Sequence, residues 1–142
     1  MATMDGTAGP DVLVGEEEDD VLNGLAGDDS LTGGDGDDTL NGDEGLDEAR
    51  WDDRGQAFSF NLGSSSFTIS EDGLESDVFF SLERIVATNH GDAFVTSADY
   101  QTDGGDGVVA IRLGSGDDTI INNDLDLRIE YESALAGVDI NF

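Results

Sequence analysis

The stretch from Gly6 to Arg50 divides into five consecutive units of nine residues: GTAGPDVLV (6–14), GEEEDDVLN (15–23), GLAGDDSLT (24–32), GGDGDDTLN (33–41) and GDEGLDEAR (42–50). Glycine holds position 1 and aspartate holds position 6 in all five units. Position 4 is glycine except for Glu18, and position 8 is leucine except for Ala49. Because these columns persist over five successive units, they define an internal repeat of nine residues.

Each column of the repeat has a physical reason. Glycine adopts positive φ without steric cost, so glycine at positions 1 and 4 lets the first six residues turn tightly and expose backbone carbonyls. The last three residues then form a short strand, in which position 8 points inward and positions 7 and 9 point outward. Nine residues make half a turn and eighteen make a coil. The pattern therefore predicts an all-β fold, a parallel β-roll or β-solenoid around a thin core of stacked leucines.

The aspartates of position 6 are the candidate metal ligands. Alternation of the loops would put Asp11, Asp29 and Asp47 along one side of the roll, with Asp20 and Asp38 along the other. Carboxylates from loops one coil apart, together with backbone carbonyls, supply the oxygen-only shell of about 6–8 ligands that Ca²⁺ prefers. Mg²⁺ fits less well, since it demands a rigid octahedron and keeps its waters. The sequence thus predicts several calcium ions held between loops.

The unit GGDGDDTLN (33–41) resembles the GGxGxDxUx pattern of the RTX (repeats-in-toxin) haemolysin-type calcium-binding family. The resemblance is close over residues 6–50 and partial afterwards. It implies a parallel β-roll with calcium-binding loops, folding that follows calcium binding, and type I secretion to an extracellular location. It also implies a role within a larger secreted toxin, adhesin or extracellular enzyme.

Residues after Arg50 depart from the repeat and then return to it. The segments 58–62 and 67–69 alternate with period two, which predicts longer strands, and 76–86 fits either a helical face or strands, with strands favoured. The motif returns in ATNHGDAFV (87–95), GGDGVVAIR (104–112) and LGSGDDTII (113–121), where Val109 replaces aspartate and predicts a gap in the metal array. We expect one solenoid over 1–142, with regular repeats at 6–50, longer β segments at 51–86 and a degenerate block at 87–142.

The candidate calcium ligands comprise the position-6 carboxylates and the loop residues that offer carbonyls. They are Asp11, Asp20, Asp29, Asp38, Asp47, Asp92 and Asp118, with Gly6, Gly9, Gly15, Gly24, Ala26, Gly27, Gly33, Gly34, Asp35, Gly36, Gly42, Gly45, Gly114 and Gly116.

A longer repeat is also suggested by an offset of 80 residues, which aligns Gly36–Thr39 with Gly116–Thr119 and Trp51 with Tyr131. It predicts matching backbones over 33–62 and 113–142, in a solenoid that continues into a neighbouring solenoid domain. The competing interpretation takes 137–142 as the tail of an export signal.

Charge limits the partners. The chain carries 34 acidic and 5 basic side chains, a net charge of −29, which repels nucleic acid and anionic membranes and attracts cations. No apolar run approaches the ~20 residues of a membrane span, so we expect no membrane insertion. The absence of cysteine excludes a thiolate metal site. Such self-repulsion on a thin core predicts a chain that stays largely unfolded until cations neutralise it.

Other functions fit the sequence less well. An EF-hand is rejected because no glutamate follows Asp35 at the twelfth place of the loop. The paired carboxylates form a periodic array without a distinctive pair, so we expect no enzyme. A calcium-dependent carbohydrate-binding or adhesion module is the alternative, with a glycan stacked on Trp51 and Tyr131, although such aromatics are more often core residues. The single histidine, His90, is expected in a turn.

Overall fold

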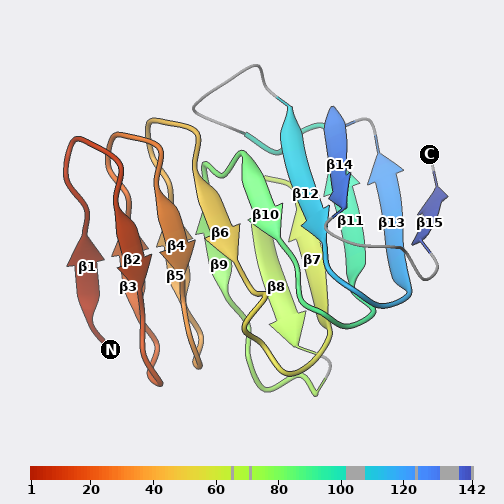
Figure 1. Cartoon of the computed structure of the whole chain (residues 1–142), viewed down its shortest axis with the longest axis horizontal. Helices are drawn as coiled ribbons and strands as arrows, with labels where there is room; N and C mark the ends of the chain where they lie inside the picture. Colours follow the sequence, from red (N-terminus) through yellow and green to blue (C-terminus); the bar gives the residue numbers. More distant parts are fainter. Residues whose placement is uncertain (65, 71, 102–107, 124, 132–137, 142) are drawn as a thin grey trace.

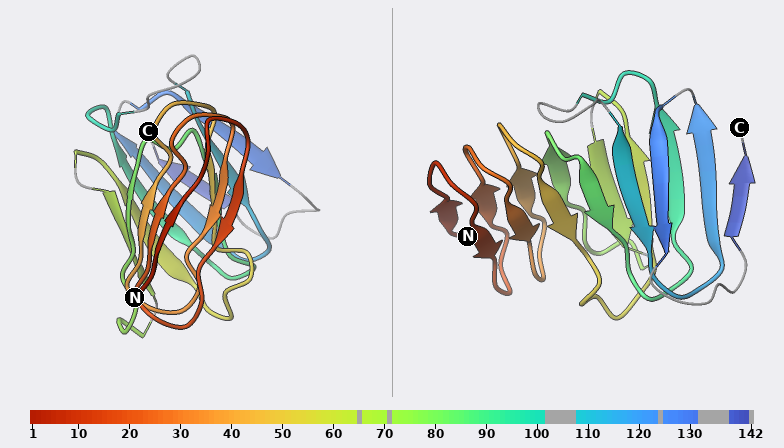
Figure 2. Two further views of the ribbon diagram at one scale, coloured as in Figure 1. Left: turned by 90° about the vertical axis from the view of Figure 1, so that its left-hand side faces the viewer. Right: turned by 45° about the horizontal axis from the view of Figure 1, so that its top comes forward.

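The computed structural model describes residues 1–64, 66–70, 72–101, 108–123, 125–131 and 138–141. Within these residues the regular elements are fifteen strands, which form two sheets wound as one flattened coil (Figures 1 and 2). The described part of the chain contains no helix that could span a membrane. The all-β parallel roll predicted from the nonapeptides is confirmed.

The larger sheet has nine strands in the order β1-β3-β5-β9-β8-β7-β11-β13-β15. These are β1 (Thr3–Asp5), β3 (Val21–Asn23), β5 (Thr39–Asn41), β9 (Val78–Phe80), β8 (Ser66–Ser70), β7 (Phe58–Leu62), β11 (Ala93–Ser97), β13 (Asp118–Asn123) and β15 (Val138–Asn141). The smaller sheet has six strands in the order β14-β12-β10-β6-β4-β2. These are β14 (Leu127–Tyr131), β12 (Val109–Leu113), β10 (Arg84–Val86), β6 (Glu48–Arg50), β4 (Ser30–Thr32) and β2 (Val12–Val14).

In the regular repeats, successive coils stack in register at an offset of eighteen residues. Leu22 faces Leu40 in one sheet and Leu13 faces Leu31 in the other. In β3 to β6 the central residue is buried and its neighbours are half-buried, as position 8 and positions 7 and 9 predict. The core of this part therefore consists of two thin columns of stacked leucines, one from each sheet, which bury little apolar surface per coil.

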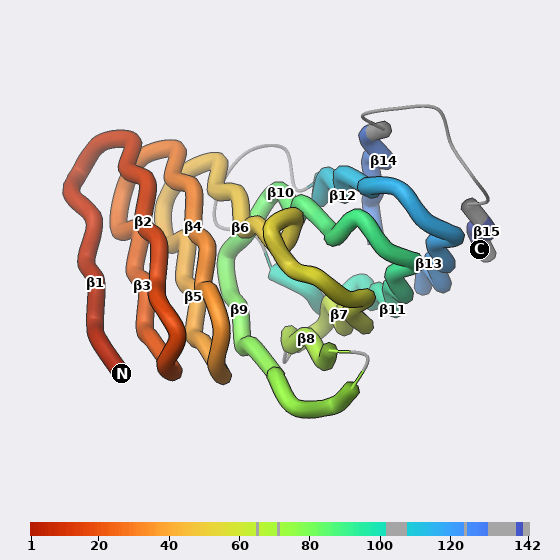
Figure 3. Tube along the Cα trace, turned by 60° about the horizontal axis from the view of Figure 1, so that its bottom comes forward, coloured from red at the N-terminus to blue at the C-terminus, as the bar shows by residue number. Residues whose placement is uncertain are grey.

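A hairpin interrupts the coil after β6. The chain runs ahead to β7, turns back as the antiparallel β8, and then returns in β9, which pairs in parallel with β5 (Figure 3). Strand β9, and not β7, thus continues the roll, and β10 then pairs with β6. The strands expected within 76–86 are confirmed. The antiparallel insertion was not predicted, because period-two alternation carries no information about strand direction.

The hairpin places an aromatic cluster at the centre of the molecule. The larger sheet gains β8 and β7 between β9 and β11, whereas β10 directly adjoins β12 in the smaller sheet. Phe60 stacks on Phe94 with ring centroids 4.5 Å apart, and Trp51 meets Phe60 edge-on at 5.2 Å. Trp51 is 3% exposed, so it is a core residue, in keeping with the commoner role of such an aromatic.

The 80-residue repeat is not reproduced in the strand arrangement. Strand β13 pairs directly with β15, whereas β9 and β8 lie between the corresponding strands β5 and β7. The prediction of matching backbones over 33–62 and 113–142 is therefore wrong. Strands β8 and β9, which follow the first stretch in sequence, separate β7 from β5 in the sheet, and a few shared residue types could not reveal this. The side chain of Tyr131 lies outside the described residues, so its equivalence with Trp51 stays a prediction.

Candidate metal centre

The position-6 aspartates form two ladders, one on each side of the roll. On one side the Asp11 N–H donates to Asp29 Oδ1 at 2.8 Å, and the Asp29 N–H donates to Asp47 Oδ1 at 2.9 Å. On the other side the Asp20 N–H donates to Asp38 Oδ1 at 2.8 Å. Except for Asp11, these aspartates are buried. One carboxylate oxygen of each receiving aspartate is thus fixed by the backbone of the preceding coil.

The second oxygen divides the loops into two kinds. In the first kind no hydrogen-bond donor among the described residues reaches Oδ2 of Asp29, Asp38 or Asp47, although all three atoms are buried. A buried carboxylate oxygen without a partner is costly, since it has lost its water without replacement. Position 2 of these loops has a positive φ, which is 77° at Leu25, 98° at Gly34 and 63° at Asp43. We refer to loops 24–29, 33–38 and 42–47 as the open loops.

In the second kind, the amide of position 2 donates to Oδ2 within the same loop. Thr7 N lies 2.5 Å from Asp11 Oδ2, Glu16 N lies 3.1 Å from Asp20 Oδ2, and Thr88 N lies 2.9 Å from Asp92 Oδ2. These position-2 residues lack the positive φ of the open loops. We refer to loops 6–11, 15–20 and 87–92 as the closed loops. Their carboxylates are satisfied by the chain itself.

Backbone carbonyls gather beside the free oxygens. A Cβ placed on Gly24 would lie 2.4 Å from Asp29 Oδ2 and 2.7 Å from the carbonyl oxygen of Gly42, one coil further on. A Cβ on Gly42 would similarly lie 2.6 Å from Asp47 Oδ2 and 2.1 Å from the carbonyl oxygen of Ser81. A side chain at position 1 of these two loops would collide with the carboxylate of its own loop and with a carbonyl of the next coil. Position 1 must therefore be glycine there. This donor set of carboxylate and carbonyl oxygens suits Ca²⁺.

The same burial shifts the acidity of these groups. Burial raises the pKa of Asp38 and of Asp47 to about 7, and neighbouring carboxylates add to the effect. The pKa of Asp92 rises less, to about 6, because burial is countered by hydrogen bonds from Phe58 and Thr88. A bound divalent cation would favour the ionised forms. At Asp20, hydrogen bonds from the backbone of Ala2 and Glu16 lower the pKa.

Two ladder members were missed by the sequence analysis. The Asp38 N–H donates to Asp77 Oδ1 at 3.0 Å, and the Asp47 N–H donates to Glu83 Oε2 at 2.9 Å. Each of these acids directly precedes a short strand, β9 or β10, as position 6 does in the repeats. That placement was the available signal, but it was hidden because the glycine columns are absent there. Position 5 also contributes, since Asp19 Oδ1 accepts from Asp37 N at 3.1 Å.

The second block keeps part of the arrangement. Asp118 Oδ1 accepts from the Asp92 N–H at 2.9 Å, and Gly116 has a φ of 134°, like the position-4 glycines of the open loops. Val109 is fully buried at the start of β12, in register with Leu127. The loop 104–107, where a weak or missing ion was predicted, lies outside the described residues. Residue His90 lies in a bend, as expected.

The remaining candidates fall within the same loops. The position-4 glycines Gly27, Gly36 and Gly45 have φ values of 127°, 120° and 158°. Ala26 forms a parallel bridge with Glu44 of the next coil. Gly114 contacts the Thr88 carbonyl oxygen, which a Cβ would approach to 2.0 Å. Within the described residues no three His, Cys, Asp or Glu side chains converge as a metal site, so a metal here would draw on carbonyl oxygens as well.

Comparison with known proteins identifies the repeats. The family model described as RTX calcium-binding nonapeptide repeat (4 copies) matches residues 3–29 and 14–48. The two matches together cover strands β1 to β5, most of the unit that contains β6, and the three open loops. Among curated proteins, none matches the chain in sequence.

Proposed function

We propose that the chain acts as a calcium-binding module whose repeats fold when calcium binds, a proposal supported by the match of the RTX calcium-binding nonapeptide repeat to residues 3–29 and 14–48. The observation that supports this most directly is the set of three buried Oδ2 atoms, on Asp29, Asp38 and Asp47, that have no hydrogen-bond partner among the described residues. Each belongs to an open loop, and backbone carbonyls converge beside those of Asp29 and Asp47. Calcium would supply the missing partner and offset part of the −29 charge.

The open loops are the proposed centres of binding. Asp29 and Asp47 would act on one side of the roll with carbonyls of position 1, and Asp38 would act on the other. Asp11 and Asp20, whose loops are closed, would contribute as neighbours one coil away. Asp92 would add little to calcium binding, because Thr88 already donates to its Oδ2, and Asp118 would contribute as the neighbour one coil away.

The wider role follows from the family. RTX repeats occur in proteins exported by type I secretion, and we propose an extracellular location within a larger protein. The module itself would be non-catalytic, because its carboxylates form regular ladders in which each accepts a hydrogen bond from the backbone of a neighbouring coil. A carbohydrate-binding module is not favoured, since Trp51 is buried in the aromatic cluster and is not exposed for stacking on a sugar.

Calcium titration followed by far-UV circular dichroism tests this function. We expect little β structure in residues 6–50 under EDTA and a rise in β signal with calcium, at concentrations on the order of 10⁻⁴–10⁻³ M per site. Equal concentrations of Mg²⁺ should not replace calcium, because the loops offer flexible carbonyl and carboxylate oxygens. Spectra that are identical in EDTA and in millimolar calcium would contradict the proposal.

A further inference from the structure

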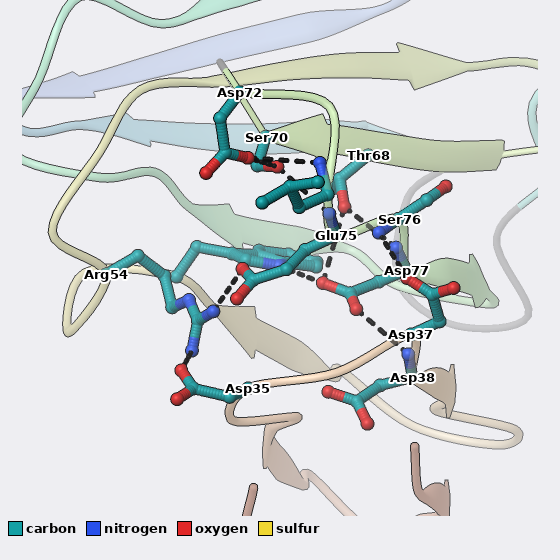
Figure 4. Close-up of polar contacts among 12 residues, drawn as sticks. Asp35, Asp37, Asp38, Arg54, Thr68, Ser70, Asp72, Glu75, Ser76 and Asp77 are labelled. Atoms are coloured by element: carbon teal, nitrogen blue, oxygen red, sulfur yellow. Dashed lines mark hydrogen bonds and ion pairs between the residues drawn. The ribbon is translucent and has the colours of Figure 1, made fainter. Parts of the chain in front are cut away.

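The ladder that contains Asp38 ends at a junction with the hairpin. The next coil on that side is not a nonapeptide loop but the turn 72–77 between β8 and β9. The ladder nevertheless continues across it, since the Asp38 N–H reaches Asp77 Oδ1 and the Ser76 N–H reaches Asp37 Oδ1 at 2.8 Å (Figure 4). Glu75 lies in the same turn. Loop 33–38 and turn 72–77 thus bring three acidic side chains each to the junction.

An arginine enters this acidic junction. Arg54 donates from Nη1 to Asp35 Oδ1 at 2.5 Å and from Nη2 to Glu75 Oε2, and so links the loop 33–38 to the turn 72–77 (Figure 4). Its side chain is only 10% exposed, and its guanidinium carbon lies 5.9 Å from the centre of the Phe58 ring. The guanidinium is thus held between carboxylates of two successive coils, at position 3 of loop 33–38 and not at Oδ2 of Asp38.

The other arginines are placed differently. Arg50, Arg84, Arg112 and Arg128 all lie on strands of the smaller sheet, where they pair with Glu48 and Glu130. Arg54 alone among the five arginines of the chain lies between two coils of the loop ladders.

The last carboxylate of the ladder is also satisfied without a metal. Asp77 Oδ2 corresponds to the free oxygen of the open loops, but here it accepts from Trp51 Nε1 at 2.6 Å and from Thr68 Oγ1 at 3.3 Å. Both donors come from the inserted segment. Residues 51–77 thus carry the cation and the donors that the junction requires.

We propose that Arg54 is a built-in cation that neutralises Asp35 and Glu75 between loop 33–38 and turn 72–77, so that these two carboxylates need no bound ion while Asp38 Oδ2 stays open to calcium. The inference rests on the proposed function, because it assigns an end to the calcium array. Because Arg54 contacts both Asp35 of the regular repeats and the ring of Phe58, it also allows these repeats to pack directly against the aromatic cluster. Loop 33–38 is bound on its far side by a charge that is always present, since a guanidinium does not lose its proton in proteins.

The experiment uses Trp51, the single tryptophan, as a reporter at the junction itself. Calcium titrations of the wild type, Arg54→Lys and Arg54→Met are followed by tryptophan emission. Arg54→Met keeps most of the side-chain volume and removes the charge together with the N–H donors to Asp35 and Glu75. We expect Arg54→Met to need at least ~10-fold more calcium to reach the buried emission, and Arg54→Lys to stay within ~3-fold of the wild type. Arg128→Met, which removes an exposed arginine of the smaller sheet, should not shift the curve.

A compensating variant separates charge from packing. Asp35→Asn and Glu75→Gln, added to Arg54→Met, remove the two carboxylates that the guanidinium neutralises, and should return the midpoint to within ~3-fold of the wild type. If Arg54→Met fails to fold at any calcium concentration, recovery in this triple variant still supports the inference, and failure to recover overturns it. An Arg54→Met curve that coincides with the wild type also overturns it. A wild type that binds no calcium in equilibrium dialysis would instead contradict the proposed function.

Discussion

Loops 33–38 and 87–92 each bury the aspartate of position 6, but they differ in whether its second carboxylate oxygen has a hydrogen-bond donor. Asp38 and Asp92 are each 1% exposed, and each fixes its Oδ1 with a backbone amide of another strand segment. The second oxygen of Asp38 has no donor among the described residues, whereas that of Asp92 accepts from the Thr88 amide and hydroxyl. The difference originates at position 2, where Gly34 has a φ of 98° and the β-branched Thr88 does not enter that region.

The aspartate column alone therefore does not define a metal site. A position-6 aspartate first serves the fold, because it ties one coil to the next through a backbone hydrogen bond. It becomes available to a cation only when the position-2 amide turns away from it. The conformation of position 2 separates open from closed loops, and variants at positions 2 and 6 can test whether that separation governs calcium binding.

The largest expected effect comes from changing the two aspartates in parallel. Asp38→Asn should raise the calcium concentration needed for folding by at least ~10-fold, because it removes a full negative charge from an open loop. Asp92→Asn should shift that concentration by less than ~3-fold. It should instead lower the free energy of unfolding in saturating calcium by about 1–3 kcal/mol, because it weakens the hydrogen bonds that Asp92 accepts from Thr88 and Phe58. Isothermal calorimetry and urea unfolding measure the two quantities.

Glu17→Gln, an exposed change of equal charge in a closed loop, serves as the control and should leave both quantities unchanged. Equal shifts in calcium midpoint for Asp38→Asn and Asp92→Asn would show that open and closed loops bind alike.

A second effect concerns pH in the absence of calcium. The folded-state pKa of Asp38 and of Asp47 is raised to about 7 by burial, above the ordinary value of an aspartate. The folded state then binds more protons than the unfolded state, so stability is present at low pH and is lost as pH rises from about 4 through 7. In EDTA at constant salt, we expect the far-UV circular dichroism to show more β structure at pH 5 than at pH 8.

The double variant Asp38→Asn/Asp47→Asn controls for the general loss of charge repulsion at low pH. Its β signal in EDTA should change less between pH 5 and pH 8 than that of the wild type. Identical pH dependence in the two proteins would mean that these two carboxyls are not protonated in the calcium-free fold.

The regular repeats were predicted well from the sequence, because each recurring position of the nonapeptide meets one local structural requirement. Leucine at position 8 fills the core, and glycine at position 4 of the open loops takes the positive φ that the pattern predicts. Glycine at position 1 has no positive φ; it avoids a carbonyl of the next coil, which the spacing did not reveal. The hairpin β7–β8 could not be derived, since its direction depends on pairing across the sheet. Asp77 and Glu83 were missed because they keep the role of position 6 without its glycines. The partners of Arg54 could not be foreseen either, because they lie 19 and 21 residues away in unlike segments.

The smallest expected effect tests position 2 itself, where open loops carry Gly34 in one case and Leu25 in another. Leu25 has a φ of 77° and is 41% exposed, so it bears backbone strain with little burial in return. A leucine with positive φ destabilises the folded state by roughly 1–2 kcal/mol. Glycine removes this strain, but the greater entropy of the unfolded chain then costs about 0.5–1 kcal/mol. Leu25→Gly should therefore stabilise the calcium-loaded protein by about 0.5–1 kcal/mol in urea unfolding.

Gly34→Ala should act in the opposite direction, with a loss of at least ~2 kcal/mol, because its Cβ would lie 2.2 Å from the carbonyl oxygen of Glu16. Gly9→Ala is the matched control, since a Cβ added at Gly9 would have no atom within 4 Å and Gly9 has no positive φ, and it should change stability by less than ~0.5 kcal/mol. A destabilised Leu25→Gly would mean that the leucine side chain stabilises the loop by packing. The positive φ would then be a consequence of that packing and not the feature that keeps the loop open.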